Sequence, residues 1–203
     1  DFMYTPMQVA DIFHLEVKIC QLGMDQRKAN VVARELGERL EFWKPICVHH
    51  HLLQGLVKPA LWPIPKGKER EALASAKMSK SVPETCVFIH DSPGEIRTKI
   101  KNAFCPERTI EFNPVIEICK YIIFRERKTF TVERPSKFGG TTEFASYGEL
   151  EDAYKAGKLH PLDLKKAVAE ELIRILAPVR RYFETNKEAR EVLEIVRRAQ
   201  VTR

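Results

Sequence analysis

The sequence lacks several features that mark whole classes of protein. A membrane-spanning helix needs an apolar run of about 18 residues, and no run in the 203 residues approaches that length. No membrane partner is therefore expected. No internal repeat or low-complexity tract is visible. The first four residues include no initiator methionine, no basic start and no apolar stretch of the kind that a signal peptide carries. We therefore expect the chain to begin inside a longer protein.

Cysteine is scarce and scattered. The five cysteines are an odd number and form no C-x-x-C pair, which argues against a disulfide scaffold and against a zinc knuckle. This pattern is typical of a reducing compartment, so we expect a cytoplasmic protein whose cysteines are mostly small buried apolar residues. They are Cys20, Cys47, Cys86, Cys105 and Cys119.

The composition is that of a folded, mildly basic protein. Apolar residues make up 44% of the chain and charged residues 31%, which is enough to build a buried core. Lysine and arginine number 34 against 28 aspartates and glutamates, a formal net charge of +6. This excess favours a polyanionic partner only mildly, because many basic proteins bind no nucleic acid.

The first part of the chain has the pattern of an α/β nucleotide-binding sheet. A proline opens the first expected helix, a glycine ends the first expected strand, and Asp25 is expected to cap the second helix. Strand, glycine and helix start in this order are typical of such sheets. Apolar periodicity predicts a helix over 6–17, a strand over 18–22, a helix over 25–38 and a strand over 46–50.

The rest of the chain is mainly helical. Prolines and a glycine interrupt 57–76, which we interpret as a long surface excursion that leads into a basic loop. We predict an α/β domain over 1–90 and a mainly helical domain over 91–203. Capping and proline signals predict helix starts at Ser92, Asn113, Ser146, Pro161 and Asn186, and alternation predicts a strand over 128–132. A helix end is expected at Gly157, and a kink or helix end at Pro178.

The basic loop carries the strongest chemical pattern. Two lysines three positions apart alternate with small hydroxyl residues, so two ammonium groups and several N–H donors can surround a triphosphate. Preorganised cations of this kind stabilise the charge that builds on a pyrophosphate leaving group. A solvated basic loop is the alternative, but the position between an α/β segment and a helical one favours the chemical interpretation. The loop consists of Lys77, Met78, Ser79, Lys80 and Ser81.

Several motifs resemble, in order, those of the archaeal and eukaryotic tyrosyl-tRNA synthetases, which are class I aminoacyl-tRNA synthetases. The lysine loop resembles the second class I signature, and the resemblance runs across nearly the whole chain. It implies the second half of a Rossmann-type catalytic domain, of α/β class, followed by a mainly helical anticodon-binding domain. The other motifs are 4–11 (YTPMQVAD), 23–28 (GMDQRK), 138–140 (FGG) and 159–163 (LHPLD).

The resemblance assigns a tyrosine site to the first two motifs. Tyr4, Gln8 and Asp11 are spaced by four and three, so they share one face of the first helix. By resemblance Asp11 accepts the hydrogen bond of the tyrosine phenol, and phenylalanine is rejected because that acceptor would stay unpaired. By resemblance Tyr4, Gln8 and Gln26 hold the α-ammonium group. Without the resemblance, a solvated Asp11 and an amphipathic core position for Tyr4 are the simpler interpretations.

The same resemblance assigns ATP and part of the tRNA. It makes Lys77 and Lys80 the catalytic residues that stabilise pyrophosphate and makes the loop 77–81 the ATP-binding segment. Mg²⁺ is expected with ATP, coordinated mainly by phosphates and water. Arg27 and Lys28 are placed beside the first base pair of the tRNA acceptor stem, with a merely solvated pair of cations as an even alternative.

The helical half is assigned to the anticodon. Phe138 offers a ring on which a base can stack, and by resemblance it binds the first anticodon base together with His160 and Asp163. The preference of acids for a first helical turn is a strong alternative for Asp163. Phosphate-facing or solvated charge is expected from Arg134, Lys137, Lys165, Lys166, Arg180, Arg181, Arg197 and Arg198.

Other features do not fit the pattern as directly. Three histidines stand at 49–51, but strand side chains alternate faces and no third ligand is placed nearby, so no protein-bound metal is expected. By resemblance one of these histidines could lie close to the nucleotide. The first class I signature, His-x-Gly-His, is absent, so half of an ATP site is expected. Leu22 stands where relatives often carry a glycine. The excursion 57–76 is longer than in many relatives.

The implied function is the ATP-dependent attachment of tyrosine to tRNA(Tyr) through a tyrosyl-adenylate, in an enzyme that is a homodimer at full length. Three alternatives stay open. One is a tryptophanyl-tRNA synthetase, which shares the fold and the lysine loop. The second is a non-catalytic tRNA-binding fragment, and the third is a generic interaction module built from an α/β part and a helical part.

Overall fold

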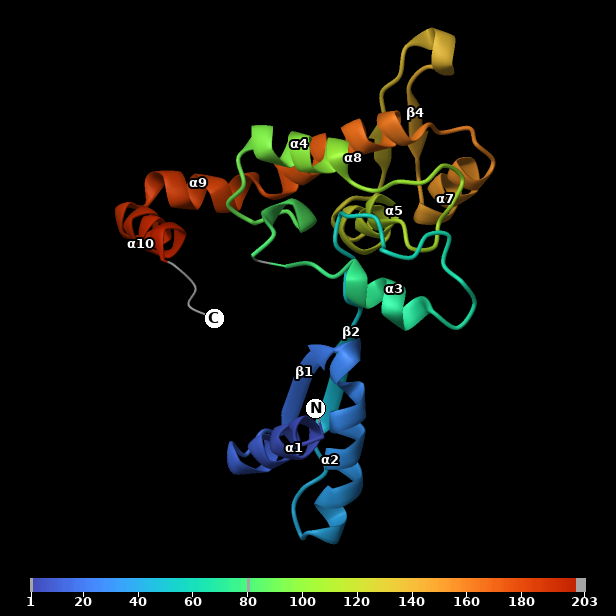
Figure 1. Ribbon diagram of the computed structural model, residues 1–203. Coiled ribbons are helices and arrows are strands. Elements are labelled where there is room, and N and C mark those ends of the chain that lie inside the picture. Colours follow the sequence, from blue (N-terminus) through green and yellow to red (C-terminus); the bar gives the residue numbers. More distant parts are fainter. Residues whose placement is uncertain (1, 80, 200–203) are drawn as a thin grey trace. The chain divides into compact units, whose positions relative to one another are not determined.

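The computed structural model describes residues 2–79 and 81–199 and forms two compact units, Asp1–Leu52 and Leu53–Arg203 (Figure 1). Lys80, one of the two predicted loop lysines, lies outside the described residues. Within the described part, no helix is both long and apolar enough to cross a membrane. The units divide the chain at residue 52, whereas the domain division predicted from the sequence falls at residue 90, and that division stays a prediction.

The first unit is a βαβ motif preceded by one helix, which confirms the α/β pattern of the sequence. The two strands pair in parallel, with Ile19 opposite Ile46 and Gly23 opposite His50. A parallel pair needs a crossover, and here the second helix supplies it. The elements are α1 (Tyr4–His14), β1 (Ile19–Gly23), α2 (Arg27–Arg39) and β2 (Ile46–His50).

A small apolar core holds this unit together. Val9, Ile12 and Phe13 of α1 are buried against Cys20 of β1 and Ala33 of α2. The backbone of α2 also approaches its neighbours closely, because a Cβ at position 37 would lie 2.5 Å from the Trp43 carbonyl oxygen. Only glycine fits there without a shift of backbone atoms. The helices are thus packed by small and apolar residues rather than by polar contacts.

The start of α2 differs from the expected capping. Asp25 lies in a single 3₁₀ turn, Met24–Gln26, and its side chain caps no helix. Its carboxylate instead accepts a hydrogen bond from Gln26 Nε2 at 3.1 Å. The extra turn moves the first α-helical residue to Arg27, which places Gln26 at the edge of β1.

The second unit contains the remaining elements, and helices dominate it. The excursion 57–76 is not entirely irregular, because its end forms α3 around the buried Ala72. The sequence EREALAS consists mostly of good helix formers, a local signal that the prolines before it obscured. The elements are α3 (Glu69–Ser75), α4 (Pro93–Asn102), α5 (Pro114–Ile118), α6 (Phe124–Glu126), β3 (Phe130–Val132), β4 (Thr142–Phe144), α7 (Tyr147–Lys155), α8 (Pro161–Ile175), α9 (Ala177–Thr185) and α10 (Lys187–Arg198).

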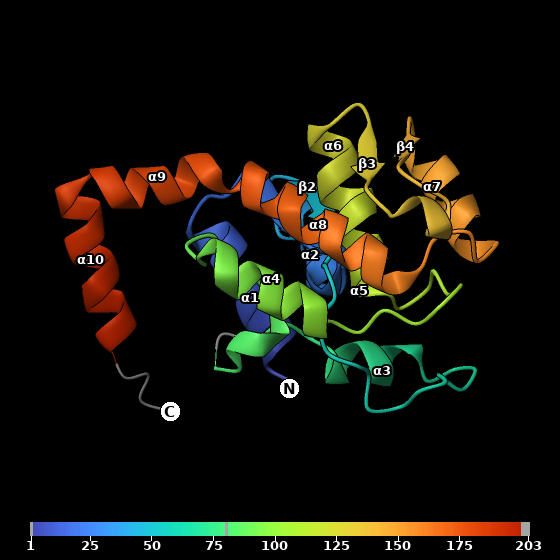
Figure 2. The same cartoon turned by 90° about the horizontal axis from the view of Figure 1, so that it is seen from above.

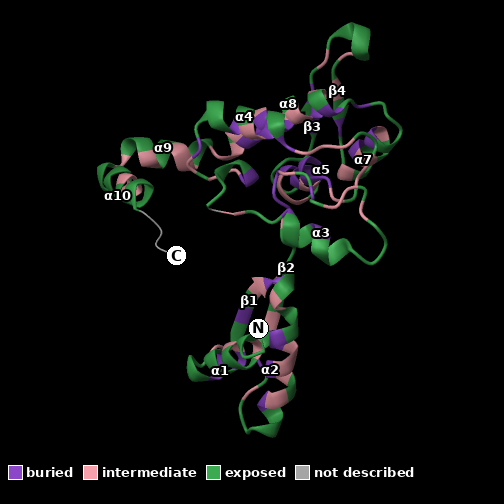
Figure 3. Cartoon of the chain, viewed as in Figure 1, coloured by how far each residue is buried: buried purple, intermediate pink, exposed green. Residues whose placement is uncertain are grey.

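One core spans this unit from α4 to α8. The helices α4 and α8 pack side by side, as Figure 2 shows, and the antiparallel pair β3–β4 lies against the same core. Ile96, Ile100, Leu164 and Val168 are fully buried between the two helices and their neighbours. Figure 3 shows the contrast with α9 and α10, which bury no residue.

Most helix boundaries follow the predicted signals. Ser92 forms a complete capping box with Glu95, and Asn186 accepts from the backbone N–H of Ala189. Ser146 accepts from the backbone N–H of Glu149, but the Glu149 carboxylate accepts from Ala145 instead of returning to Ser146, so only half of that box forms. The helix predicted to start at Asn113 forms as α5 and α6, joined by one π turn, Cys119–Ile123.

The cysteines are largely buried, as expected. Cys20, Cys86 and Cys119 are buried, and Cys47 and Cys105 are half-buried. Burial raises the pKa of the Cys20 and Cys119 thiols. These thiols therefore stay protonated at neutral pH and act as small apolar side chains.

A buried carboxylate on α8 makes the stability of the second unit depend on pH. Burial alone raises the pKa of Glu171, but hydrogen bonds from Arg127 and Arg174 outweigh it and hold the pKa below its ordinary value. The unfolded chain therefore binds more protons in acid, and stability falls as the pH drops below about 5. We call the fall in stability below about pH 5 the acid limb. We expect Glu171→Gln to lower the free energy of unfolding at pH 7 and to make the acid limb less steep.

The measurement is the midpoint of urea unfolding at several pH values between neutral and about pH 3. Midpoints are compared where the dependence of the unfolding free energy on urea concentration is the same. Glu188→Gln, a change of an exposed glutamate on α10, is the matched control and should leave the acid limb unchanged. An acid limb equally steep in Glu171→Gln and in the unchanged chain would contradict the assignment.

Candidate functional site

The four side chains predicted to bind tyrosine line one cavity in the first unit. The cavity has a volume of about 510 Å³. Tyr4, Gln8 and Asp11 reach it from successive turns of α1, and Gln26 reaches it from the turn after β1. The spacing along α1 predicted the first three on one face, whereas only the fold brings Gln26 beside them. Their individual roles stay predictions.

Hydrogen bonds orient the polar wall of this cavity. The Tyr4 hydroxyl donates to Gln26 Oε1 at 3.1 Å. Gln26 in turn donates to Asp25, which fixes the orientation of its amide. Gln8 Oε1 is buried and has no hydrogen-bond partner among the described residues. An unpaired buried acceptor is costly, so this oxygen is set up to receive a donor from a ligand.

The rest of the cavity is mainly apolar. An apolar surface with a few polar groups at one side suits a ligand that has a ring and a charged or polar end. The Asp11 carboxylate is exposed and lies in the same lining, where it can accept from a ligand hydroxyl. The apolar lining consists of Ile12, Leu15, Val17, Ile19, Cys20 and Leu22.

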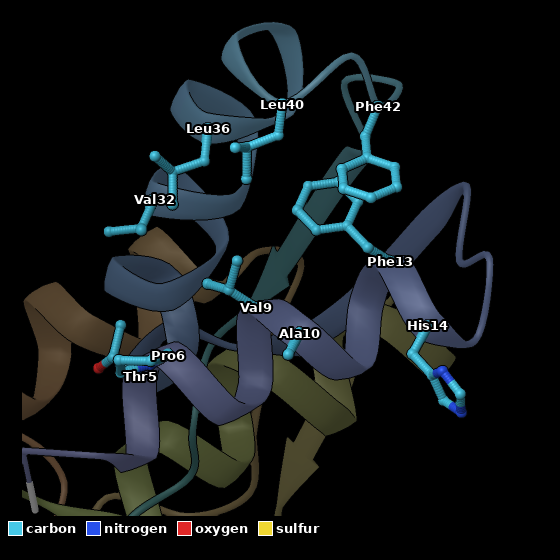
Figure 4. A pocket seen from close by; sticks show the side chains of 10 residues that line it. All are labelled: Thr5, Pro6, Val9, Ala10, Phe13, His14, Val32, Leu36, Leu40 and Phe42. Atoms are coloured by element: carbon cyan, nitrogen blue, oxygen red, sulfur yellow. The ribbon is translucent and has the colours of Figure 1, made fainter.

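A second cavity of the first unit is larger but has a different character. It has a volume of about 660 Å³ and lies between α1 and α2 (Figure 4). Val9, Phe13, Leu36 and Leu40 line it, and the rings of Phe13 and Phe42 stack with centroids 4.7 Å apart. Its lining includes none of the predicted site residues. Because it offers few polar groups to orient a substrate, the smaller cavity is the better candidate site.

The predicted acceptor-stem residues and the histidine run lie nearby in the same unit. Arg27 and Lys28 are exposed in the first turn of α2, as a contact with an anion requires, and their role stays a prediction. His49 Nε2 lies 3.0 Å from Nδ2 of the fully buried Asn30, so this histidine ties β2 to α2. Among the described residues, no group of three or more His, Cys, Asp or Glu side chains is arranged to hold a metal ion.

The lysine loop lies in the second unit. Lys77 and Met78 are exposed, and Ser79 is half-buried with its hydroxyl 3.1 Å from that of Ser81. The exposed Lys77 is free to meet a phosphate, whereas Lys80 lies outside the described residues. The binding of ATP by this loop stays a prediction.

Residues that the sequence did not single out hold the loop at its base. The backbone N–H groups of Gly55 and Leu56 donate to the carbonyls of Ala76 and Thr85, at 2.7 and 2.8 Å. A Cβ at position 55 would lie 2.5 Å from the Ala76 oxygen, so the approach requires glycine. The two stems of the loop are therefore clamped by neighbouring residues of one segment.

Thr85 adds a brace inside the loop. Its buried hydroxyl accepts from the Ser79 N–H at 2.8 Å and lies 2.7 Å from the Val82 carbonyl, to which it donates. This contact shapes the turn that presents Lys77 and its neighbours. No spacing in the sequence distinguishes this threonine, because its partners are backbone atoms brought close only by the folded loop.

The predicted anticodon residues also lie in the second unit. Phe138 ends a short turn between β3 and β4, with 59% of its surface exposed, and Lys137 Nζ lies 4.8 Å from its ring centroid. His160 is the N-cap of α8, where Nδ1 accepts from the Leu162 N–H at 3.2 Å, and Asp163 lies in the first turn. An exposed ring is what base stacking requires, although the contact with a base stays a prediction.

Several cations predicted to face phosphate or solvent also bond within the chain, and their contact with phosphate stays a prediction. Lys165 Nζ donates to the Lys101 carbonyl at 3.1 Å, and Arg180 donates to the Ile173 carbonyl. Arg197 pairs with Glu194 at 3.2 Å. The partner of Lys165 lies on α4, a helix distant in the sequence, whereas Glu194 lies three residues before Arg197 on the same helix.

Comparison with known proteins decides the family. Residues 1–177 match the family described as tRNA synthetases class I (W and Y). The chain belongs to this family. Its mixture of an α/β unit and a helical unit is therefore the class I synthetase arrangement that the motifs predicted.

Several relatives of the chain are named tyrosine–tRNA ligases. The chain is 51% identical to the tyrosine–tRNA ligase of Pyrococcus horikoshii and 50% identical to that of Thermococcus sibiricus, over 99% of its own length. It covers 56% of each of these proteins, so it spans about half the length of the curated relatives that it matches.

Solved structures agree with this. The tyrosyl-tRNA synthetase of Pyrococcus horikoshii complexed with L-tyrosine has a TM-score of 0.84 at 52% identity, over 95% of this chain and 55% of that one. The tryptophanyl-tRNA synthetase of Giardia lamblia is 18% identical with a TM-score of 0.55, which shows the shared fold alone. The resemblance to tyrosyl-tRNA synthetases is confirmed and is favoured over the tryptophanyl alternative.

Proposed function

We propose that the chain is part of a tyrosine–tRNA ligase and supplies its tyrosine-binding wall, its lysine loop and its anticodon-binding part. The observation that carries the proposal is the cavity lined by Tyr4, Gln8, Asp11 and Gln26, four side chains from two segments. The tyrosine–tRNA ligases of Pyrococcus and Thermococcus, at 50% identity or more, support the same substrate.

Each polar group of the cavity has a task in binding tyrosine. The buried Gln8 Oε1 accepts from the substrate ammonium, which gives that oxygen its missing partner. Tyr4 and Gln26, bonded to each other, form the rest of the ammonium site. Asp11 accepts from the phenol, so the cavity selects an aromatic amino acid that carries a hydroxyl.

The reaction has two steps. In the first, the tyrosine carboxylate attacks the α-phosphorus of ATP, the bond to the β-phosphate breaks, and pyrophosphate leaves while tyrosyl-adenylate forms. In the second, a hydroxyl of the tRNA 3′ end attacks the tyrosyl carbonyl, and AMP leaves. Lys77 and Lys80 stabilise the charge that develops on pyrophosphate. Because no bond to the enzyme forms, catalysis depends on positioning and electrostatic stabilisation.

The remaining partners follow from this reaction. Mg²⁺ enters with ATP as part of the substrate and is held by phosphate oxygens and water. Arg27 and Lys28 contact the acceptor stem, and Phe138, His160 and Asp163 bind the first anticodon base. The full-length enzyme is a homodimer in the cytoplasm.

The direct test is pyrophosphate exchange by the full-length protein with tyrosine or tryptophan, followed by charging of tRNA(Tyr). We expect exchange with tyrosine only. Exchange with tryptophan, or no exchange with either amino acid, would overturn the proposal. In parallel, the 203-residue chain should bind an anticodon stem-loop of tRNA(Tyr) more tightly than one with a changed first anticodon base.

Removing the ring at position 138 separates tRNA recognition from chemistry. We expect Phe138→Ala to weaken binding of the tRNA(Tyr) stem-loop about 5- to 150-fold, since base–aromatic stacking contributes about 1–3 kcal/mol per base. Pyrophosphate exchange by the full-length variant should not change, because it does not need tRNA.

Tyr182→Ala is the matched control, because Tyr182 is an aromatic residue of similar exposure on α9. It should leave the stem-loop affinity unchanged. Equal losses of stem-loop binding and of pyrophosphate exchange in Phe138→Ala would show that the ring has a structural role instead.

A further inference from the structure

Arg134 lies two residues after the end of β3 and uses all three guanidinium nitrogens within the chain. Nε donates to the Gly140 carbonyl at 3.1 Å, and Nη2 donates to the Thr142 hydroxyl at 2.7 Å. Nη1 donates to the Lys158 carbonyl at 2.7 Å. A guanidinium has its donors in one rigid plane, so a single arginine can hold several acceptors in fixed relative positions.

The acceptors belong to two segments that are distant in the sequence. Gly140 belongs to the arm between β3 and β4 that carries Phe138, and Thr142 is the first residue of β4, at the base of this arm (Figure 1). Lys158 lies two residues before His160, in the connection that enters α8. Arg134 therefore joins the two segments that carry the predicted anticodon residues.

Among the described residues, the backbone hydrogen bonds at the tip of the arm are local. The β3–β4 ladder ends at the pair Val132 and Thr142, and the backbone N–H groups of Phe138 and Gly140 bond only locally, to the Pro135 carbonyl. Gly139 has φ +98°, and a Cβ there would lie 3.4 Å from Arg134 Nη2. A side chain at position 139 would thus be strained and would crowd the guanidinium.

We propose that Arg134 is a positioning residue for tRNA recognition, which holds the Phe138 arm against the segment of His160 and Asp163 so that both reach one base. The proposal rests on the anticodon-binding role proposed above. It assigns Arg134 no contact with phosphate and so differs from the expectation based on charge alone. The variant Arg134→Gln keeps a polar side chain but removes two of the three bonded nitrogens and the charge.

The test uses the 203-residue chain and two RNA stem-loops that differ only in the first anticodon base, guanine or adenine. Guanine is the expected base, because the Asp163 carboxylate can accept from a guanine edge. We expect Arg134→Gln to weaken the guanine stem-loop about tenfold more than the adenine stem-loop, as loss of one base-specific contact does. The slope of log affinity against log salt should also stay the same. A phosphate-binding arginine would instead lower that slope by about 0.7–0.9 and weaken both RNAs equally.

Arg97→Gln is the matched control. Arg97 forms a comparable pair of hydrogen bonds with Glu170, between α4 and α8, and lies in the same unit. Its loss should leave base preference and salt slope unchanged. A reduced base preference in this control as well would show that any broken brace has the effect and would overturn the specific role of Arg134.

Trypsin provides a readout that needs no RNA. Lys137 lies at the tip of the arm, so Arg134→Gln should speed cleavage after Lys137, whereas Arg97→Gln should not. If the unchanged chain shows no base preference, the anticodon role fails, and the cleavage rate alone decides whether Arg134 orders the arm. An unchanged cleavage rate in Arg134→Gln would overturn the proposal itself.

Discussion

Replacing Asp11 by alanine should remove most of the preference for tyrosine over phenylalanine. In the proposed site, bound tyrosine covers the Asp11 carboxylate and pairs with it, whereas phenylalanine would cover the same carboxylate and leave it unpaired. An unpaired buried acceptor costs about 1–3 kcal/mol, and more for a charged one. We therefore expect the ratio of kcat/KM for the two amino acids to fall by one to two orders of magnitude, or roughly 10- to 100-fold.

The measurement is pyrophosphate exchange with each amino acid by the full-length protein. Glu35→Ala removes an exposed carboxylate from α2 of the same unit and is the matched control for a change in charge. The control should keep the tyrosine preference. A preference that is just as strong in Asp11→Ala would mean that this carboxylate does not meet the phenol.

Replacing Asp91 by alanine is expected to destabilise the second unit by about 3–5 kcal/mol, the range for breaking a buried ion pair by removing one partner. The Asp91 side chain is 4% exposed and accepts from Lys99 Nζ at 2.6 Å. The same oxygen accepts from the Phe88 backbone N–H at 2.8 Å. Without the carboxylate, the largely buried Lys99 ammonium loses its counter-charge, and the Phe88 N–H loses its acceptor.

Urea unfolding, followed by the far-ultraviolet circular dichroism of the helices, measures this loss of stability. Glu170→Ala removes the partner of Arg97 from an exposed pair on the neighbouring helix and should cost less than about 1 kcal/mol. The double variant Asp91→Leu, Lys99→Met should recover much of the loss, because no isolated charge is left buried. A single variant Asp91→Ala as stable as Glu170→Ala would contradict the assignment.

The local elements could be predicted because their signals are local. Ser92, with proline next and Glu95 three positions on, is sufficient to start α4, because the capping contacts join neighbouring residues. The two short strands of the first unit follow equally from apolar runs bounded by a glycine and a proline. The predicted cap at Asp25 was wrong because an additional turn, stabilised by the surrounding fold, moved the start of α2.

The candidate site could be predicted in part. The spacing of Tyr4, Gln8 and Asp11 predicts a common helix face, and resemblance supplies Gln26 and the lysine loop. No sequence pattern identified Thr85, Gly55 or the brace by Arg134, because the partners of each are set by how the loops fold and not by a regular spacing. The Thr85 hydroxyl, the missing Cβ of Gly55 and the Arg134 guanidinium are features that many residues share. Their structural roles depend on the partners that the fold places beside them.

The amino-acid order alone thus settled the class of fold, most helix starts and the family, since these depend on periodicity, capping contacts and motifs within a few residues. Tertiary structure decided three other contacts. They are the contact of Gln26 with α1, the hydrogen bonds of Gly55 and Leu56 at the base of the lysine loop, and the bonds by which Arg134 joins the two predicted anticodon segments. They require a parallel strand pair, a closed loop and a guanidinium that spans two connections, and each of these exists only when distant backbone groups come within hydrogen-bond distance.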